Sequence, residues 1–204
     1  MPENLPLDKA APLLCAGITT YSPLRHHKIK AGDKVGVVGL GGLGHMAVKI
    51  AVAMGAEVTV ISSSNKKKED ASRFGAKNYI NTSDPSVFTE NANKFDFMIN
   101  TVGADMDLTP YMELLKLDAT MVQVGAPEKA NTMNTRALIH RRRNLSGSLI
   151  GGVQETQEML DFCGKHNITS DIELIPMDKI NEANDRILKS DVRYRFVIDM
   201  KSLK

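Results

Sequence analysis

The chain has 204 residues, and its 26 Lys and Arg against 24 Asp and Glu leave a formal net charge of +2. This balance argues against nucleic-acid and anionic-membrane partners, which attract strongly basic proteins. The sequence holds no apolar run near the ~20 residues that span a bilayer and no signal-peptide pattern, and its two cysteines, Cys15 and Cys163, form no disulfide framework. We therefore expect a cytoplasmic protein of one domain, or of one domain plus a piece of another.

Three prolines, Pro2, Pro6 and Pro12, interrupt the first stretch, where we expect a short helix over residues 7–21 and a loop over residues 23–33. A regular alternation of elements follows. Strands are predicted at residues 34–38, 57–62, 78–81, 95–101, 120–124 and 145–150, and helices at residues 42–54, 66–74, 110–115 and 135–142. This alternation predicts an α/β fold, a doubly wound six-stranded parallel sheet with helices on both faces.

The rhythm changes after Gly151 and Gly152. Helices are expected at residues 154–166 and 177–190, and strands at residues 171–176 and 194–200. Because the sheet is complete before this point, we expect the tail to belong to a different folding unit.

A glycine-rich loop joins the first strand of the predicted sheet to the next helix. Gly39, Leu40, Gly41, Gly42, Leu43 and Gly44 fit the pattern G-x-G-x-x-G. In a Rossmann unit the first glycine permits a tight turn, the second lets a pyrophosphate approach the backbone, and the third lets the helix pack on the strand. Free N–H groups at the helix start then attract phosphates. The alternative is a purely structural turn, but the place of the loop between a strand and a helix favours a dinucleotide site.

The end of the second predicted strand bears on the choice between NAD and NADP. Sites that prefer NAD place an acid about 20 residues after the glycines, on the adenosine ribose. This sequence instead has Ser62, Ser63 and Ser64, and then three lysines at residues 66–68 that we expect in the first turn of a helix. Hydroxyls and lysines bind a 2′-phosphate that an acid would repel. The alternative is that Ser64 or Asn65 caps the helix and the lysines are solvated.

Four segments resemble the zinc-dependent medium-chain alcohol dehydrogenases, above all their cinnamyl-alcohol-dehydrogenase-like branch. They are residues 11–21 (APLLCAGITTY), 38–46, 60–68 and 191–196 (DVRYRF), so the resemblance runs from end to end. It implies an NADP(H)-dependent enzyme in which zinc polarises a carbonyl oxygen and the nicotinamide delivers hydride. It also implies a small alcohol or aldehyde substrate, and a homodimer formed where the sixth strands of two subunits pair.

The resemblance also implies roles for individual residues. Cys15 matches the last ligand of the catalytic zinc, and Thr19 matches a residue near the cofactor phosphates and nicotinamide. The loop from Gly39 to Gly44 matches the pyrophosphate site. The 2′-phosphate pocket is matched by Ser62, Ser63, Ser64 and Lys67, and the nicotinamide side by Thr101, Gly125, Ser148, Leu149 and Ile150.

The sequence departs from this family in its metal ligands. It holds no Cys-x-x-Cys, Gly-His-Glu or His-Glu-x-x-His, and Cys15 alone cannot hold a catalytic zinc, which needs about three protein ligands. The histidines, His26, His27, His45, His140 and His166, have no ligand spacing to Cys15. A small semi-buried thiol is thus an equal alternative for Cys15. We expect no complete catalytic set in this chain, and zinc only in the full-length enzyme.

The resemblance divides the chain into three parts. Residues 1–14 are expected to be a remnant of the catalytic domain or a linker, residues 15–152 the NADP-binding Rossmann domain, and residues 153–204 a segment that completes the catalytic domain of the full enzyme. Met1 directly before a mid-protein sequence indicates an engineered or natural truncation. The last part then has an apolar face with less to cover it, so we expect extra self-association or a loosely held tail. This face comprises Met159, Leu160, Phe162, Ile172, Leu174, Phe196 and Ile198.

The leading hypothesis is therefore the cofactor-binding part of an NADP(H)-dependent, zinc-dependent alcohol dehydrogenase or aldehyde reductase, which binds NADPH but shows negligible turnover by itself. The rival is a stand-alone NADP(H)-binding or interaction module without catalysis. A third hypothesis, nucleic-acid binding through residues 140–143 (HRRR), is disfavoured because the run is short and lacks interleaved aromatics. Cations that complement a helix C-terminus explain it better.

Overall fold

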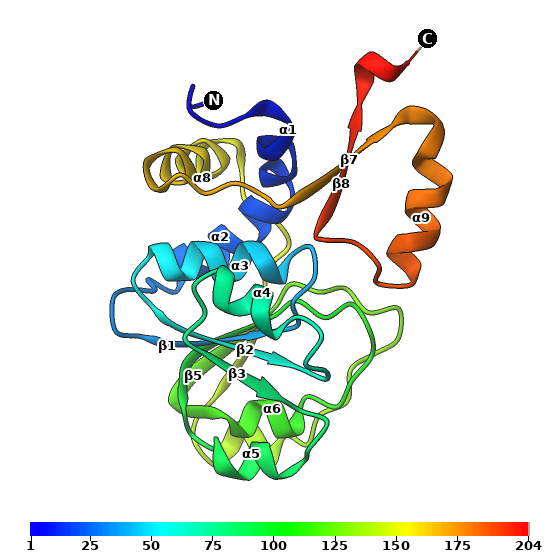
Figure 1. Cartoon of the computed structure of the whole chain (residues 1–204). Helices are drawn as coiled ribbons and strands as arrows, with labels where there is room; N and C mark the ends of the chain where they lie inside the picture. The colour runs from blue at the N-terminus through cyan, green and yellow to red at the C-terminus, as the bar shows by residue number, and fades with distance from the viewer. Residues whose placement is uncertain (204) are drawn as a thin grey trace.

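A six-stranded parallel sheet lies at the centre of the computed structural model, which describes residues 1–203 (Figure 1). The strands are β1 (Lys34–Val38), β2 (Glu57–Ser62), β3 (Asn78–Asn81), β4 (Phe95–Asn100), β5 (Leu115–Gln123) and β6 (Asn144–Gly147). Their order is β3-β2-β1-β4-β5-β6, and every neighbouring pair is parallel. The winding direction therefore reverses between β1 and β4, which is where such sheets bind ligands. The predicted fold class is confirmed.

Helices cover both faces of the sheet, because side chains along each strand point alternately to the two sides. Val35 and Val37 of β1 face one apolar cluster, and Val38 faces another. The first cluster lies under α2 (Ala16–His26), α3 (Gly44–Ala53), α4 (Lys68–Arg73) and α8 (Val153–His166), and the second under α6 (Thr109–Glu113) and α7 (Arg136–Ile139), with α5 (Ser86–Glu90) packed beside them. Figure 1 shows α3 above the sheet and α5 and α6 below it.

The N-terminal stretch differs from the prediction of one helix followed by a loop. It forms α1 (Leu7–Ala10), a 3-10 turn (Ala11–Leu14) and α2, which runs through Pro23 to His26. Helical structure is interrupted at Cys15, whose backbone angles (φ −125°, ψ −75°) are not helical. Helix α2 continues past Tyr21 because Leu24 is fully buried against the sheet, so apolar burial outweighs the hydrogen bond that Pro23 cannot make.

Several predicted boundaries also need correction. Strand β5 begins at Leu115, five residues before the predicted start at Thr120, and β6 ends at Gly147. Ser148, Leu149 and Ile150 therefore lie beyond the sixth strand and not in it. Helix α4 begins at Lys68, and its first turn holds Glu69 and Asp70, so the three lysines do not share that turn as predicted. The short helix α5 was not predicted.

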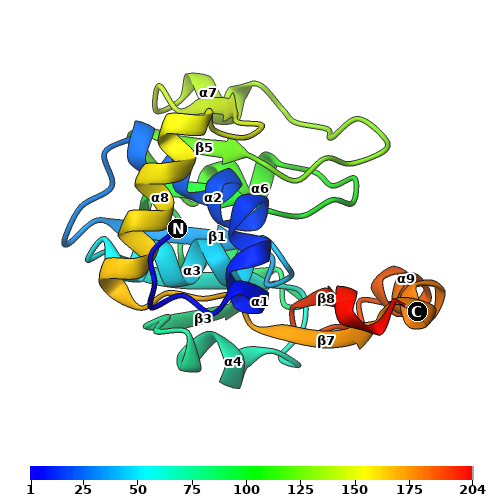
Figure 2. The ribbon, with the colours of Figure 1, turned by 90° about the horizontal axis from the view of Figure 1, so that it is seen from above.

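The segment after the sheet has two parts with different environments. Helix α8 packs along α2, where Tyr21 contacts Phe162 and Arg25 pairs with Glu158 at 2.7 Å. Met159 and Leu160 are buried there, so the expectation that they lack cover is wrong. The rest is a C-terminal arm, residues 172–202, which projects from the body (Figure 2). It consists of β7 (Ile172–Pro176), a 3-10 turn (Met177–Lys179), α9 (Ile180–Leu188), β8 (Arg195–Asp199) and a last 3-10 turn (Met200–Ser202).

The arm leaves apolar side chains in contact with solvent. Strands β7 and β8 pair with each other in parallel and with no other strand among residues 1–203. Leu174 is 54% exposed and Leu188 is 85% exposed. Self-association through this arm stays a prediction. Among the described helices, none combines the length and apolar character needed to cross a membrane.

Candidate dinucleotide site

The glycine loop occupies the reversal point between β1 and β4. Gly39 has a φ of +86°, which side chains rarely tolerate, and a Cβ there would lie 2.9 Å from Val102 Cγ2. A Cβ on Gly44 would lie 2.1 Å from the carbonyl oxygen of Gly39, so the helix start packs directly on the turn. A Cβ on Gly41 would meet nothing within 4 Å. The loop is therefore closed on the protein side and open at the position where a pyrophosphate is expected.

The hydrogen bonds of the loop leave its donors available and its acceptors occupied. Side chains bind the carbonyl oxygens of residues 38–42 at distances between 2.8 and 3.3 Å. The four donors are Thr101 Oγ1, Lys67 Nζ, His45 Nδ1 and Arg195 Nε. The N–H groups of residues 40–43, by contrast, donate to no acceptor in the described part of the chain. A backbone segment with unpaired donors at a helix N-terminus is suited to bind an anion.

A cavity of about 640 Å³ joins the loop to the end of β2. It brings together several of the residues predicted for the cofactor: Gly39, Leu40, Gly41, Ser62, Ser63, Ser64, Lys67 and Thr101. Lys66 and Arg193 add positive charge to its wall. One acid, Asp191, also lines it, and its carboxylate accepts from Arg186 Nε at 3.1 Å. Hydroxyls and cations thus predominate at the place where NAD sites carry an acid.

Lys67 links the two halves of this cavity. Its Nζ donates to the carbonyl oxygen of Leu40 at 2.9 Å and lies 5.2 Å from the ring centre of Tyr194. Burial and the charge of Arg193 lower the pKa of Lys67 below its ordinary value. Both effects disfavour the ammonium form, whereas the negative charge of a bound phosphate would favour it.

A second cavity, of about 370 Å³, lies on the other side of the loop and was not predicted. Gly41, Gly42 and Leu43 form one wall. The opposite wall comes from β8 and the preceding segment of the C-terminal arm, and it includes Ser190, Tyr194, Arg195 and Phe196. These residues lie some 150 positions after the loop, so no motif spacing could have found them. The only signal was the pair of arginines within residues 191–196.

The other predicted cofactor residues lie outside these two cavities. Thr19 is buried within α2, and Gly125 packs so closely on the segment after β4 that a Cβ would lie 2.1 Å from the carbonyl oxygen of Val102. Ser148 lines a separate cavity between α2 and β6, while Leu149 is 87% exposed and Ile150 is 51% exposed. Contact between these residues and a cofactor stays a prediction.

The described residues do not fit a zinc ion by themselves. Cys15 is exposed, and not semi-buried as one alternative had it. Residues 1–203 contain no group of three or more His, Cys, Asp or Glu side chains that could hold a metal ion. His45 is fully buried and bonded to the protein, so it is not open to a ligand. Cys15 can therefore supply at most one ligand to a shared site.

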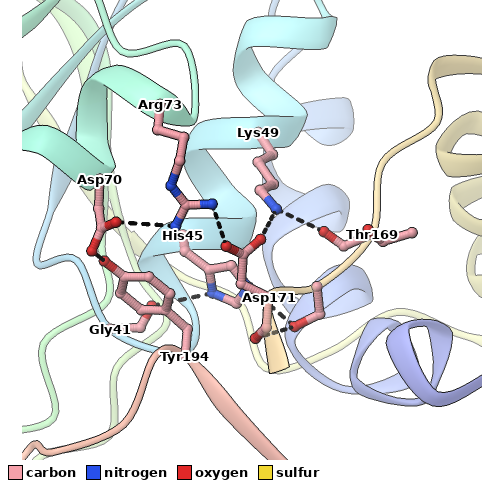
Figure 3. Close-up of polar contacts among 9 residues, drawn as sticks. Gly41, His45, Lys49, Asp70, Arg73, Thr169, Asp171 and Tyr194 are labelled. Carbon is pink, nitrogen blue, oxygen red and sulfur yellow. Dashed lines mark hydrogen bonds and ion pairs between the residues drawn. The ribbon is translucent and has the colours of Figure 1, made fainter. Parts of the chain in front are cut away.

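A polar cluster beneath the loop joins α3 and α4 to the arm (Figure 3). Asp171 accepts from Arg73 Nη1 at 2.6 Å and also pairs with Lys49. Although burial opposes ionisation, hydrogen bonds from Lys49 and Arg73 hold the pKa of Asp171 below its ordinary value. The Tyr194 hydroxyl donates to Asp70 at 2.5 Å. This cluster attaches the arm to the helices that flank the loop.

The arginine run at residues 141–143 is largely engaged within the chain. Arg143 is buried, and its guanidinium donates to the carbonyl oxygens of Leu115 and Ala137 at 2.8 and 2.9 Å. Arg142 forms a two-point pair with Asp118, both at 2.6 Å. These contacts hold α7 against β5, which gives the run a structural role.

Comparison with known proteins agrees with this geometry. The family model for zinc-binding dehydrogenases matches residues 42–165. NADP-dependent alcohol dehydrogenase C 1 of Mycolicibacterium smegmatis is 59% identical over all 204 residues, which cover 58% of that protein. A cinnamyl alcohol dehydrogenase structure from Sorghum bicolor superposes with a TM-score of 0.96 at 47% identity, covering 100% of this chain and 58% of that one. The structure of CAD from Helicobacter pylori complexed with NADP(H) gives a TM-score of 0.88 at 47% identity, covering 97% and 56%.

Proposed function

Because the chain belongs to the zinc-binding dehydrogenase family, we propose that it forms the NADP(H)-binding part of an alcohol dehydrogenase. The enzyme would transfer hydride between NADPH and a small aldehyde or primary alcohol. The chain spans about 58% of the length of the relatives it matches, so this activity is proposed for the whole enzyme. The observation that carries the proposal is the 640 Å³ cavity, where unpaired loop donors meet three serines and Lys67 and the strand ends without an acid.

The binding mode follows from the chemistry of the cavity walls. The N–H groups of residues 40–43 and the start of α3 would hold the pyrophosphate, because they supply donors and partial positive charge. Ser62, Ser63, Ser64 and Lys67 would hold the 2′-phosphate. Bound NADPH would supply the hydride. Thr101 lies in both cavities and would border the path toward the nicotinamide.

The remaining roles are proposed from the family resemblance. Cys15 would supply one ligand to the zinc of the full enzyme, and Thr19, Gly125 and residues 148–150 would lie on the nicotinamide side. Residues 1–14 and 153–204 would pack with a catalytic domain around the domain formed by residues 15–152. All four residues of β6 are exposed, which supports a homodimer formed by pairing of this edge strand. The location proposed for the enzyme is the cytoplasm.

A second candidate is an NADP(H)-binding module without catalysis. It is supported by the lack of a metal-binding group among residues 1–203. The two candidates differ in whether the chain takes part in turnover when a catalytic domain is present. The chain alone, supplied with Zn²⁺, NADPH and an aldehyde, should oxidise no NADPH under either candidate. Restored turnover on addition of a separately made family catalytic domain would support the enzyme and contradict the module.

Calorimetric titration of the chain with NADPH and NADH tests the proposal. We expect NADPH to bind at least tenfold more tightly, since charge-assisted hydrogen bonds to a phosphate are worth about 1.5–3 kcal/mol. Ser62→Asp should remove this preference, because its carboxylate would face the 2′-phosphate. Ser83→Asp adds the same charge after β3, outside the cavity, and should leave the preference intact. Equal weak binding of both cofactors by the unmodified chain would contradict the proposal.

A further inference from the structure

His45 is a buried titratable residue that the proposed binding mode does not use. Its side chain is fully buried, and its ring stacks on Tyr194 with centres 5.0 Å apart and planes 16° apart. The two ring nitrogens contact two parts of the chain that are far from each other in sequence. Nδ1 lies 3.3 Å from the carbonyl oxygen of Gly41 in the glycine loop, and Nε2 lies 3.1 Å from Ser170 Oγ. The imidazole therefore bridges the loop and the segment that precedes the arm.

The chemistry of these partners fixes the form of the ring. Burial lowers the pKa of His45 to about 3, so the imidazole is neutral near pH 7. A carbonyl oxygen only accepts, and Nδ1 must therefore carry the proton that faces Gly41. Nε2 is then unprotonated and faces the Ser170 hydroxyl, whose proton can go to Nε2 or to the carbonyl oxygen of Asp171, 3.3 Å from Ser170 Oγ. The Gly41 carbonyl thus selects the tautomer, and Ser170 contacts the other side of the ring.

The hydrogen bond to Gly41 has a consequence on the other side of the same peptide group. In a planar trans peptide, the C=O of one residue and the N–H of the next point in opposite directions. The Gly41 carbonyl also accepts from the backbone N–H of His45 at 3.0 Å, and the imidazole adds a second donor that further restrains the direction of the Gly42 N–H. That N–H is one of the loop donors without a partner among residues 1–203. An orientation fixed before binding lowers the entropic cost of binding a phosphate.

We propose that His45, held in place by its contact with Ser170, is a positioning residue for the pyrophosphate-binding loop. This inference rests on the proposed function, because it concerns how the loop receives NADP(H). It makes the segment before the arm part of the cofactor site, although Ser170 touches neither of the cavities beside the loop. The alternative is that His45 only fills space between α3 and Tyr194.

Two substitutions separate these roles. In His45→Asn the amide nitrogen can take the place of Nδ1 and keep the bond to Gly41, whereas in His45→Gln the amide group lies at the place of Nε2 and can keep only the contact with Ser170. Calorimetric titration of the full chain with NADPH should show about a tenfold weaker Kd for His45→Gln and at most about a twofold change for His45→Asn. Ser170→Ala, which leaves the imidazole in place, should weaken NADPH binding about threefold because the ring loses the contact that holds its Nε2 side.

Adenosine 2′-monophosphate provides the control ligand, because it carries the 2′-phosphate and no pyrophosphate. Its Kd should be unchanged in all three variants. Equal weakening of NADPH by the Asn and Gln variants, or weakening of adenosine 2′-monophosphate by His45→Gln, would overturn the positioning role. If the two substitutions at position 45 prevented folding, an unchanged NADPH affinity in Ser170→Ala would overturn it. Failure of the unmodified chain to bind NADPH would instead refute the proposed function.

Discussion

The six-stranded sheet and the C-terminal arm are stabilised by different interactions. In the sheet, Phe97 and Ile99 of β4 are at most 2% exposed and pack in the apolar cluster that lies under α2, α3, α4 and α8. In the arm, every residue of β8 is only half-buried, and a two-stranded pair has little stability by itself. The arm is attached through Tyr194 and Arg195, and through Asp171 directly before it, and these residues contact α3, α4 and the glycine loop. Loosening the arm should therefore disturb the cofactor site before it disturbs the sheet.

The largest expected effect comes from removing apolar volume from the sheet. Ile99→Ala should lower the free energy of unfolding by about 3 kcal/mol, because it leaves a cavity at a fully buried position. Ile198→Ala makes the same change at a half-buried position of β8 and should cost less than about 1 kcal/mol. Urea unfolding of both variants measures the difference. Equal losses would mean that the arm is packed as tightly as the sheet.

Acidification should destabilise the junction between arm and body through His45. Burial and the charge of Lys49 lower the pKa of its folded form to about 3, whereas an unfolded histidine titrates near 6.5. The unfolded state therefore binds the extra proton between these values, and the free energy of unfolding falls as the pH falls, by about 2 kcal/mol between pH 7 and pH 5. Urea unfolding at these two pH values should show this loss in Ile99→Ala, which keeps His45. The loss should be smaller in His45→Asn, which lacks the imidazole. The same pH dependence in both variants would assign it to other groups.

The smallest effect is expected from the ion pairs of Asp171. Asp171→Asn keeps the shape of the side chain but weakens its pairing with Lys49 and Arg73. Hydrogen exchange in β8 and α9 should become about fivefold faster, while exchange in β1 and β4 stays unchanged. Asp185→Asn, at an exposed position of α9 with no ion pair among the described residues, is the matched control. Faster exchange throughout the sheet would show that the arm and the sheet open together.

The sequence predicted the parts of the fold that local patterns determine. Strands β1, β2 and β3 have the predicted bounds because short apolar runs end at glycine, serine or asparagine. The helix through Pro23 was missed because burial of Leu24 is a tertiary effect that outweighs the local propensity of proline. Residues 148–150 were assigned to the sixth strand, but pairing with β5 ends at Gly147.

The candidate site divides in the same way. The glycine loop and the serines after β2 are local motifs, and the cavity brings them together. Arg195, Ser170 and Tyr194 reach the loop or His45 over separations of 125 residues or more, which no spacing rule describes. Lys67 was expected in the first turn of a helix, but α4 begins one residue later, at Lys68. The Nζ of Lys67 donates to the carbonyl oxygen of Leu40 in the glycine loop.

The bond between Arg195 and the carbonyl oxygen of Gly42 has a consequence for biosynthesis. The two residues are 153 positions apart, and a chain emerges from the ribosome N-terminus first. The sheet strands and the loop are therefore synthesised well before the arginine that completes the loop. During translation, a nascent chain can form the sheet while its phosphate-binding loop still lacks this contact. Cofactor binding would then come late in maturation, after the arm has docked.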